Sequence, residues 1–202
     1  MHSWRDIGKK LVLASQSPRR KQILHLMGMS FDVRIPANID EQKILASHGG
    51  SIEEALTALA VEKARSVGPA ENECALGADT IVFHDGAVLG KPEGVSEAIA
   101  MITGLSGGGH RVYSGVALVS GTQTIAAQCA CTEVYFRNLD EDEVETYIAG
   151  GEWKDKAGGY GIQGSAMAFV EKINGCFYNV MGLPVMATIT LFKHYHAARK
   201  ER

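Results

Sequence analysis

The stretch LVLASQSPRRKQIL, residues 11–24, decides the fold because it joins a short apolar strand directly to a helix. Ser17 is a good residue to cap a helix, and Pro18 stands at the favoured first helical position. Arg19 and Arg20 then occupy the first turn, where the helix dipole is already positive and acidic residues are usual. The pattern therefore predicts a negatively charged partner supplied from outside the chain.

Strand and helix patterns alternate on either side of this stretch. A capping-box pattern, Ser51-Ile-Glu-Glu54, predicts a helix that ends near Gly68. Further strands are expected at 31–35, 74–78, 81–83, 112–119 and 124–137. Further helices are expected from a cap at Ser96 to about residue 102, from 140 to 150 and after 184. The order favours an α/β or α+β domain built around a mixed sheet.

Length and composition limit the classes of function. The 202 residues carry 46% hydrophobic and 21% charged side chains, which is typical of one globular domain, with two small lobes possible. A net charge of −3 argues against a broad surface for nucleic acid or for an anionic membrane. No apolar run approaches the roughly 20 residues of a membrane span, and the apolar stretch near the N-terminus is too short for a signal peptide. We therefore expect a cytoplasmic protein.

Four cysteines are present, at positions 74, 129, 131 and 176. Cys129 and Cys131 have no second pair at the spacing of a zinc site. Reduced cysteines in the core are the preferred interpretation, over a zinc site or a disulfide.

The turn before the first helix is the first candidate site. A strand-to-helix turn exposes free backbone N–H groups, which bind phosphate well. The hydroxyl groups of Ser15 and Ser17 add donors, and the guanidinium groups of Arg19 and Arg20 can clamp phosphate oxygens. The alternative is a capped surface helix with two solvated arginines.

Acids and lysines elsewhere could complete such a site. Asp79 lies in an apolar run, and we expect it at a strand end or bend with a metal ion or cation nearby, because an unpartnered buried carboxylate is costly. Glu41 belongs to an acidic pair in an expected loop; with Asp79 it could hold Mg²⁺. Lys63 and Lys91 stand in apolar or constrained settings. The alternatives are a structural aspartate, a solvated acidic pair and two surface lysines.

The most distinctive stretch is GEWKDKAGGYGIQG, residues 151–164. Its glycines permit close approach of the backbone, Lys154 and Lys156 supply charge, and the amide of Gln163 can read the edge of a base. The alternative is an irregular surface loop. Taken together with the arginines and acids, this stretch favours a site for a nucleoside triphosphate with a divalent ion.

The chain resembles the Maf family of nucleoside triphosphate pyrophosphatases. The motifs occur in the family's order and span nearly the whole chain. They are ASQSPRR (14–20), IDE (39–41), LAVEKA (59–64), LGADTIV (76–82), LGKP (89–92), LSGGGHRVYSGVAL (105–118), GEWKDKAGGYGIQG (151–164) and NVMGLP (179–184).

The resemblance implies a role for each matching residue. Asp79 matches the family's proton acceptor. Positions that handle phosphate and metal are matched by Ser15, Arg20, Glu41, Lys63 and Lys91, and positions tied to base selectivity are matched by Arg19, Thr80 and Gln163. The D-K-A-G-x-Y-x-I-Q pattern is similar to the branch that hydrolyses dTTP and UTP, and differs from the branch that acts on 7-methyl-GTP.

The resemblance also implies an architecture. We expect one Maf-like domain over residues 1–202, with about 1–10 and 194–202 as peripheral extensions. Its fold would be an elongated mixed sheet flanked by helices, with two lobes around a cleft, like inosine triphosphate pyrophosphatases. Mg²⁺ or Mn²⁺ is the expected cofactor, and a homodimer is possible. The alternatives are the same chemistry on a modified nucleotide, or a non-catalytic nucleotide-binding regulator of cell division.

Overall fold

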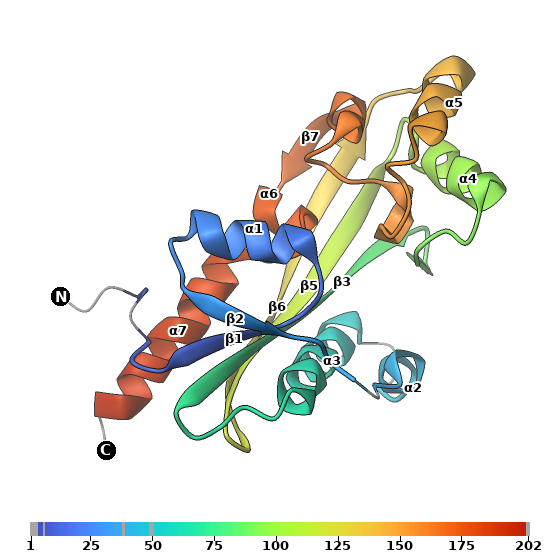
Figure 1. The fold of residues 1–202 in the computed structure, drawn as a ribbon. Coiled ribbons are helices and arrows are strands. Elements are labelled where there is room, and N and C mark those ends of the chain that lie inside the picture. The colour runs from blue at the N-terminus through green and yellow to red at the C-terminus, as the bar shows by residue number, and fades with distance from the viewer. Residues whose placement is uncertain (1–3, 6, 38, 49–50, 201–202) are drawn as a thin grey trace. The chain divides into compact units, whose positions relative to one another are not determined.

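The structure, a computed structural model, describes residues 4–5, 7–37, 39–48 and 51–200 (Figure 1). Its strands are β1 (Lys10–Ala14), β2 (Phe31–Arg34), β3 (Glu73–His84), β4 (Ala87–Leu89), β5 (Gly109–Ser120), β6 (Gln123–Phe136) and β7 (Val170–Asn174). Its helices are α1 (Pro18–Leu26), α2 (Glu41–Ala46), α3 (Ile52–Ser66), α4 (Val95–Leu105), α5 (Glu141–Gly150), α6 (Phe177–Val180) and α7 (Val185–Lys200), with short 3₁₀ turns η1 (Ala157–Gly159) and η2 (Ser165–Phe169).

The N-terminal strand and helix form as the sequence predicts. The side chain of Ser17 accepts a hydrogen bond from the backbone N–H of Arg20 at 3.4 Å, and Pro18 begins α1. Gly28 follows α1 with a φ of +72°, a conformation that favours glycine at the end of a helix. Strand β1 lies parallel to both β2 and β3, with Leu13 opposite Val33 and Leu76.

The strands form one mixed sheet in the order β2-β1-β3-β5-β6-β7, with β4 paired to β3. The chain divides into two compact units. The first comprises residues 1–79, 114–130 and 182–202, and the second comprises residues 80–113 and 131–181. Strands β3, β5 and β6 each contribute residues to both units. The sheet contains both parallel and antiparallel pairs and the chain also forms helices, which confirms the mixed α/β class expected from the sequence.

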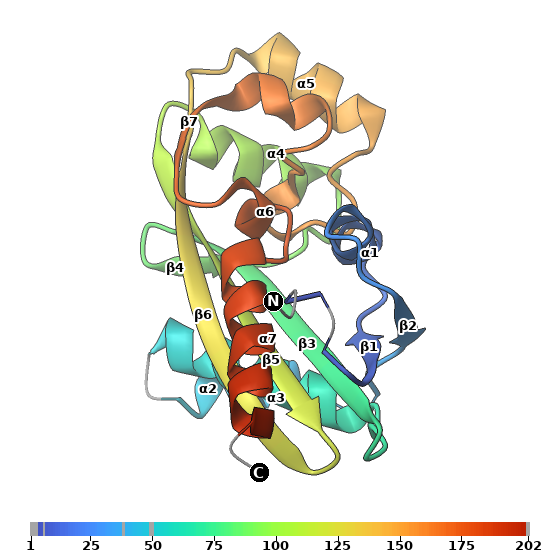
Figure 2. The same cartoon turned by 90° about the vertical axis from the view of Figure 1, so that its left-hand side faces the viewer.

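In the first unit, α3 and α7 lie on opposite faces of the sheet (Figure 2). Helix α3 packs very closely because β3 and β5 each place a glycine beneath it. A Cβ atom on Gly77 would lie 2.0 Å from the carbonyl oxygen of Ala60, and one on Gly115 would lie 2.2 Å from that of Leu56. Glycine therefore sets how near α3 approaches the sheet.

In the second unit, aromatic side chains form much of the core. Phe136 stacks edge-on against His110, Tyr160 and Phe169, and Tyr147 also contacts Phe169. Such edge-to-face pairs bury large rings while keeping a fixed geometry.

Three local predictions were wrong. Asp79 lies inside the continuous strand β3, not at a strand end or bend, because its carboxylate has a partner within the fold. The acidic pair at 40–41 is not in a loop, since Asp40 caps α2 and Glu41 is the first helical residue. Helix α4 begins at Val95 after Gly94, without the expected cap from Ser96.

The cysteine prediction was right in one respect and wrong in another. None of the four cysteines forms a disulfide, but only Cys74 is buried. Cys131 is exposed, and Cys129 and Cys176 are half-buried. Cys129 and Cys131 lie in the part of β6 before Thr132, where no residue is fully buried. Among the described residues, no helix is long and apolar enough to cross a membrane.

Candidate active site

A lysine held between two carboxylates forms the centre of the candidate site in the first unit. The Nζ atom of Lys63 lies 2.5 Å from Oδ1 of Asp79 and 2.7 Å from Oε1 of Glu41. The lysine side chain is 11% exposed and that of Asp79 is 15% exposed, whereas Glu41 is half exposed. Lys63 is therefore a largely buried charge paired with two acids. The alternative interpretation of Lys63 as a surface lysine is wrong.

The sequence explains how Lys63 comes to point inward. The buried residues of α3 are Ala55, Leu56, Leu59, Ala60, Lys63 and Ala64. Lys63 thus extends the apolar stripe that packs on the sheet, and its position three residues after Ala60 keeps it on that face. Because Gly77 lets α3 approach β3, the ammonium group reaches Asp79 two residues further along the strand.

The turn between β1 and α1 is organised by Ser15, which is 5% exposed. Its Oγ accepts hydrogen bonds from the backbone N–H of Ser17 at 3.2 Å and from Nη1 of Arg20 at 3.1 Å. The Nε of Arg20 donates to the carbonyl oxygen of Gly182 at 2.8 Å. Arg20 is therefore held at two points of its guanidinium group and is not a freely solvated side chain.

The electrostatics of this turn favour an added anion. Burial lowers the pKa of Arg20, Asp79 and Glu41 raise it, and the neighbouring Arg19 lowers it further. The first turn of α1 contains no acidic residue. Within the first unit, the acids near Lys63 are thus the charges that stabilise Arg20, and a bound polyanion would strengthen that balance.

The donor set also fits a divalent ion. Asp79 and Glu41 both reach one cation, the Lys63 ammonium, so their oxygens converge on a common region. Magnesium is usually held by one or two carboxylates together with phosphate oxygens of a substrate. Within the described residues, no three His, Cys, Asp or Glu side chains lie together as metal ligands.

The second unit holds the remaining predicted residues. Lys91 and Gln163 are exposed. Lys154 is also exposed, and its Nζ lies 5.7 Å from the ring centroid of Trp153. Nζ of Lys156 donates to the carbonyl oxygen of Glu152, so this lysine is turned back on its own loop.

The stretch 151–164 is an ordered loop, not an irregular one. The carboxylate of Glu152 accepts from the backbone N–H of Ser165 at 2.9 Å and closes the loop. Gly158 donates its N–H to the carbonyl oxygen of Gly90 at 2.9 Å, beside Lys91. The loops that carry Lys91 and Gln163 are therefore joined within the second unit. Thr80 lies next to Asp79 in β3, as the first residue of that unit.

These placements group the sequence-predicted residues by unit. The first unit brings together Ser15, Ser17 and Arg20 at one turn, and Glu41, Lys63 and Asp79 in one cluster; Arg19 lies beside Arg20. A family model described as Maf-like protein matches residues 10–195, on which all of these groups lie. The chain belongs to the Maf family.

Several curated relatives of this Maf chain are named dTTP/UTP pyrophosphatase. The relative from Clostridium perfringens strain 13 is 44% identical over 189 residues, which cover 92% of this chain and 97% of the relative. The relative from Pyrococcus abyssi is 43% identical over 194 residues, covering 95% of this chain and all of the relative. The relative from Desulfitobacterium hafniense is 44% identical over 189 residues, which cover 90% of this chain and 83% of the relative.

Sequence reasoning about this Maf chain missed two groups that the structure shows. Gly182, in the motif NVMGLP, holds Arg20 through its carbonyl oxygen, although that motif reads only as a helix start. The side chains of His110 and Tyr160 form a hydrogen bond in the second unit. Backbone acceptors leave no signal in side-chain identity, and the His–Tyr pair is separated by 50 residues.

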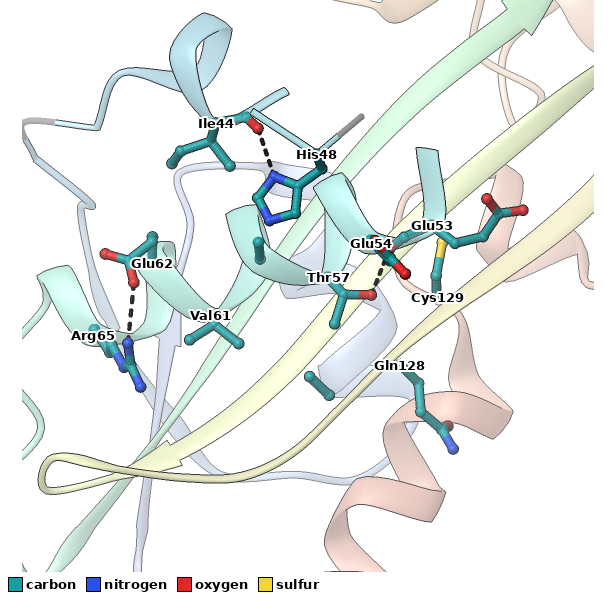
Figure 3. Close-up of a pocket in the computed structure, with 12 residues that line it drawn as sticks. Ile44, His48, Glu53, Glu54, Thr57, Val61, Glu62, Arg65, Gln128 and Cys129 are labelled. Carbon is teal, nitrogen blue, oxygen red and sulfur yellow. Dashed lines mark hydrogen bonds and ion pairs between the residues drawn. The ribbon is translucent and has the colours of Figure 1, made fainter. Parts of the chain in front are cut away.

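A separate hollow of about 810 Å³ lies in the first unit of the Maf chain (Figure 3). It lies against α3, between α2 and β6, and contains none of the predicted site residues. Its lining includes Ile44, His48, Thr57, Val61, Gln128 and Cys129. Figure 3 shows His48 bonded to the carbonyl oxygen of Ile44 and Thr57 bonded to that of Glu53, so the polar groups here serve the helices themselves.

Proposed function

We propose that this chain hydrolyses the bond between the α- and β-phosphates of dTTP and UTP, giving a nucleoside monophosphate and pyrophosphate. Family membership and the printed names of several relatives support this proposal. The observation that carries it is the cluster of Lys63 between Asp79 and Glu41, in the same unit as a helix start that lacks acids. A protein that only bound a polyanion would gain nothing from those two carboxylates.

In the proposed reaction, Asp79 accepts a proton from a water molecule whose oxygen attacks the α-phosphorus. The bond from that phosphorus to the bridging oxygen breaks, and pyrophosphate leaves with the electron pair. Arg20, Lys63 and Lys91 offset the negative charge that grows on the leaving group. A divalent ion, Mg²⁺ or Mn²⁺, held by Asp79 and Glu41 would bind phosphate oxygens and reduce their charge.

The remaining residues are proposed to bind substrate. Ser15, Ser17 and the start of α1 would hold the triphosphate through hydroxyl and backbone donors. Gln163, with Thr80 and Arg19, would contact the O4 and N3–H edge of the pyrimidine, and Lys154 and Lys156 would add positive charge nearby. A site built to hydrogen-bond one base edge rejects bases that leave its polar groups unpaired.

A panel of nucleoside triphosphates tests the proposal. Pyrophosphate and inorganic phosphate are measured separately with Mg²⁺, with Mn²⁺ and with EDTA present. We expect pyrophosphate from dTTP and UTP, little phosphate, and loss of turnover with EDTA. Release of phosphate would place the cleaved bond elsewhere, preference for 7-methyl-GTP would change the substrate, and tight binding without turnover would indicate a regulator.

Two further proposals rest on the family resemblance and on composition. We propose a homodimer, which light scattering on the purified chain would detect as a doubled mass. We also propose a cytoplasmic location, without nucleic-acid or membrane partners, which fractionation of cells that express the chain would test.

A further inference from the structure

A buried polar pair lies beneath the loop that carries Gln163. Tyr160, in that loop, is 6% exposed, and its hydroxyl oxygen lies 2.7 Å from Nε2 of His110 on β5. His110 is 3% exposed. Both rings stack edge-on against Phe136, so the hydrogen bond sits in an aromatic environment that excludes water.

Both partners are neutral at physiological pH. Burial, with a smaller contribution from the nearby His84, lowers the pKa of His110 to about 4. Burial raises the pKa of the Tyr160 hydroxyl, with a contribution from Tyr147. A neutral hydrogen bond in a dry setting is costly to lose, because the remaining partner is then left buried and unpaired.

Two other hydrogen bonds fix the residues just before Tyr160. The hydroxyl of Tyr147 donates to the carbonyl oxygen of Gly159 at 3.0 Å, and the N–H of Gly158 donates to Gly90. Gly158 and Gly159 both have positive φ, a conformation for which glycine is suited. Three consecutive residues are thus hydrogen-bonded to other parts of the unit: Gly158 to the loop of Lys91, Gly159 to α5 and Tyr160 to β5. Gln163 follows three residues after Tyr160.

We propose that His110 and Tyr160 are positioning residues that set the base preference of the enzyme by holding the loop of Gln163 in one conformation. Neither side chain contacts the substrate in this proposal. It rests on the proposed function, and it deepens that function by assigning selectivity to a bond beneath the loop as well as to the residues that face the base.

The position of the bond predicts which kinetic constants change. Asp79 and Lys63, proposed to act on the phosphates, belong to the first unit, and neither is in the loop. Lys91, also proposed to act on the phosphates, is joined to the loop by the hydrogen bond from Gly158 to Gly90, which removal of the Tyr160 hydroxyl leaves in place. Loosening the loop should therefore weaken binding of the preferred base and admit others, while the chemical step is largely kept. A hydroxyl that served only packing would change stability and leave the preference among bases unaltered.

Tyr160→Phe removes the hydroxyl and keeps the ring. We expect KM for dTTP to rise about five- to tenfold, kcat to stay within about twofold, and the ratio of kcat/KM for UTP over CTP to fall about tenfold. Tyr113→Phe is the matched control, because Tyr113 is also buried in the second unit but lies outside the loop. It should leave that ratio unchanged.

A second pair of variants tests the other partner. His110→Gln retains a polar group able to bond Tyr160 and should keep part of the discrimination, whereas His110→Leu should lose it. A folded Tyr160→Phe protein whose UTP-to-CTP ratio stays within about twofold of the wild type overturns the proposal. If the wild type itself releases no pyrophosphate, the proposed function fails separately. The same variants are then compared by calorimetric Kd values for dTTP and CTP, and an unchanged Kd ratio again overturns the positioning role.

Discussion

Asp79 is the residue on which the proposed chemistry depends, and its setting separates catalysis from folding. In Asp79→Asn the amide keeps the shape of the side chain, and Lys63 keeps its ion pair with Glu41. We expect turnover to fall about 10³-fold, since general acid–base catalysis contributes about 10²- to 10⁴-fold, with the fold retained. Steady-state kinetics and circular dichroism measure the two effects. Asp142→Asn, at an exposed acid of α5, should leave turnover unchanged; near-wild-type activity in Asp79→Asn would remove Asp79 from the mechanism.

Gly182 acts on Arg20 through its backbone. Its φ of +110° is strained for alanine, and its carbonyl oxygen accepts from Arg20 Nε. Gly182→Ala should lower kcat/KM about ten- to hundredfold by displacing the guanidinium group, and should cost about 1 kcal/mol of stability.

The matched control for that change is Gly121→Ala, in the turn between β5 and β6. Gly121 also has a positive φ, and a Cβ atom there would meet nothing within 4 Å. It should cost similar stability without loss of activity. Equal kinetic effects in both variants would show that strain, and not the position of Arg20, is responsible.

At the scale of elements, the contact of α3 with β3 brings Lys63 to Asp79. Gly77→Ala would place a methyl group 2.0 Å from the carbonyl oxygen of Ala60 and 2.8 Å from the backbone nitrogen of Ala64, so helix and strand must separate. We expect a loss of about 1–3 kcal/mol in the free energy of unfolding, with reduced turnover. Urea denaturation measures the first and pyrophosphate release the second.

Gly104→Ala provides the comparison for this prediction. Gly104 lies in α4, and a Cβ atom there would meet nothing within 4 Å. The substitution should raise stability by about 0.5–1 kcal/mol, because alanine favours a helix over glycine. A Gly77→Ala protein as stable as the wild type would show that the α3–β3 contact tolerates expansion.

Elements with strong local signals were predictable from the sequence. Helix α1 has its cap at Ser17, and the capping pattern at Ser51 begins α3. Elements without such signals were missed, among them α2, β4, β7 and α6, which have 6, 3, 5 and 4 residues. Short elements contain too few residues for a period to show, and their formation depends on neighbours that are distant in sequence.

The candidate site was predictable in its residue types more than in its contacts. The charge of Lys63 and its place after an apolar stripe marked it as unusual, yet pairing with both Asp79 and Glu41 required the fold. For Lys156 the residue type alone suggested a substrate contact, whereas the fold shows its ammonium group donating a hydrogen bond to a backbone oxygen of its own loop.

For the molecule as a whole, His110 and Glu143 are the two groups whose shifted pKa values define separate pH ranges of stability. His110 has its pKa lowered from 6.5 to about 4 in the folded protein, so the unfolded chain binds the proton first as pH falls. Stability should therefore decrease between about pH 6.5 and 4, at up to about 1.4 kcal/mol per pH unit. Glu143, bonded to Arg137 and to the backbone N–H of Asp140, has its pKa lowered to about 2, so its contribution is lost only between about pH 4.5 and 2.

Urea denaturation at a series of pH values separates the two ranges. His110→Gln should flatten the curve between about pH 4.5 and 6.5 and leave the fall below that range in place. An unchanged slope in the upper range would show that another group binds the proton.

The first unit is assembled from three separate segments of the chain, the last of which begins at Gly182. A ribosome therefore has to synthesise nearly the entire polypeptide before that unit holds all its parts. Arg20 emerges early, but the oxygen that orients its guanidinium group comes about 160 residues later. A nascent chain stalled before residue 182 should consequently lack the arginine geometry proposed for phosphate binding, whatever local helices it has already formed.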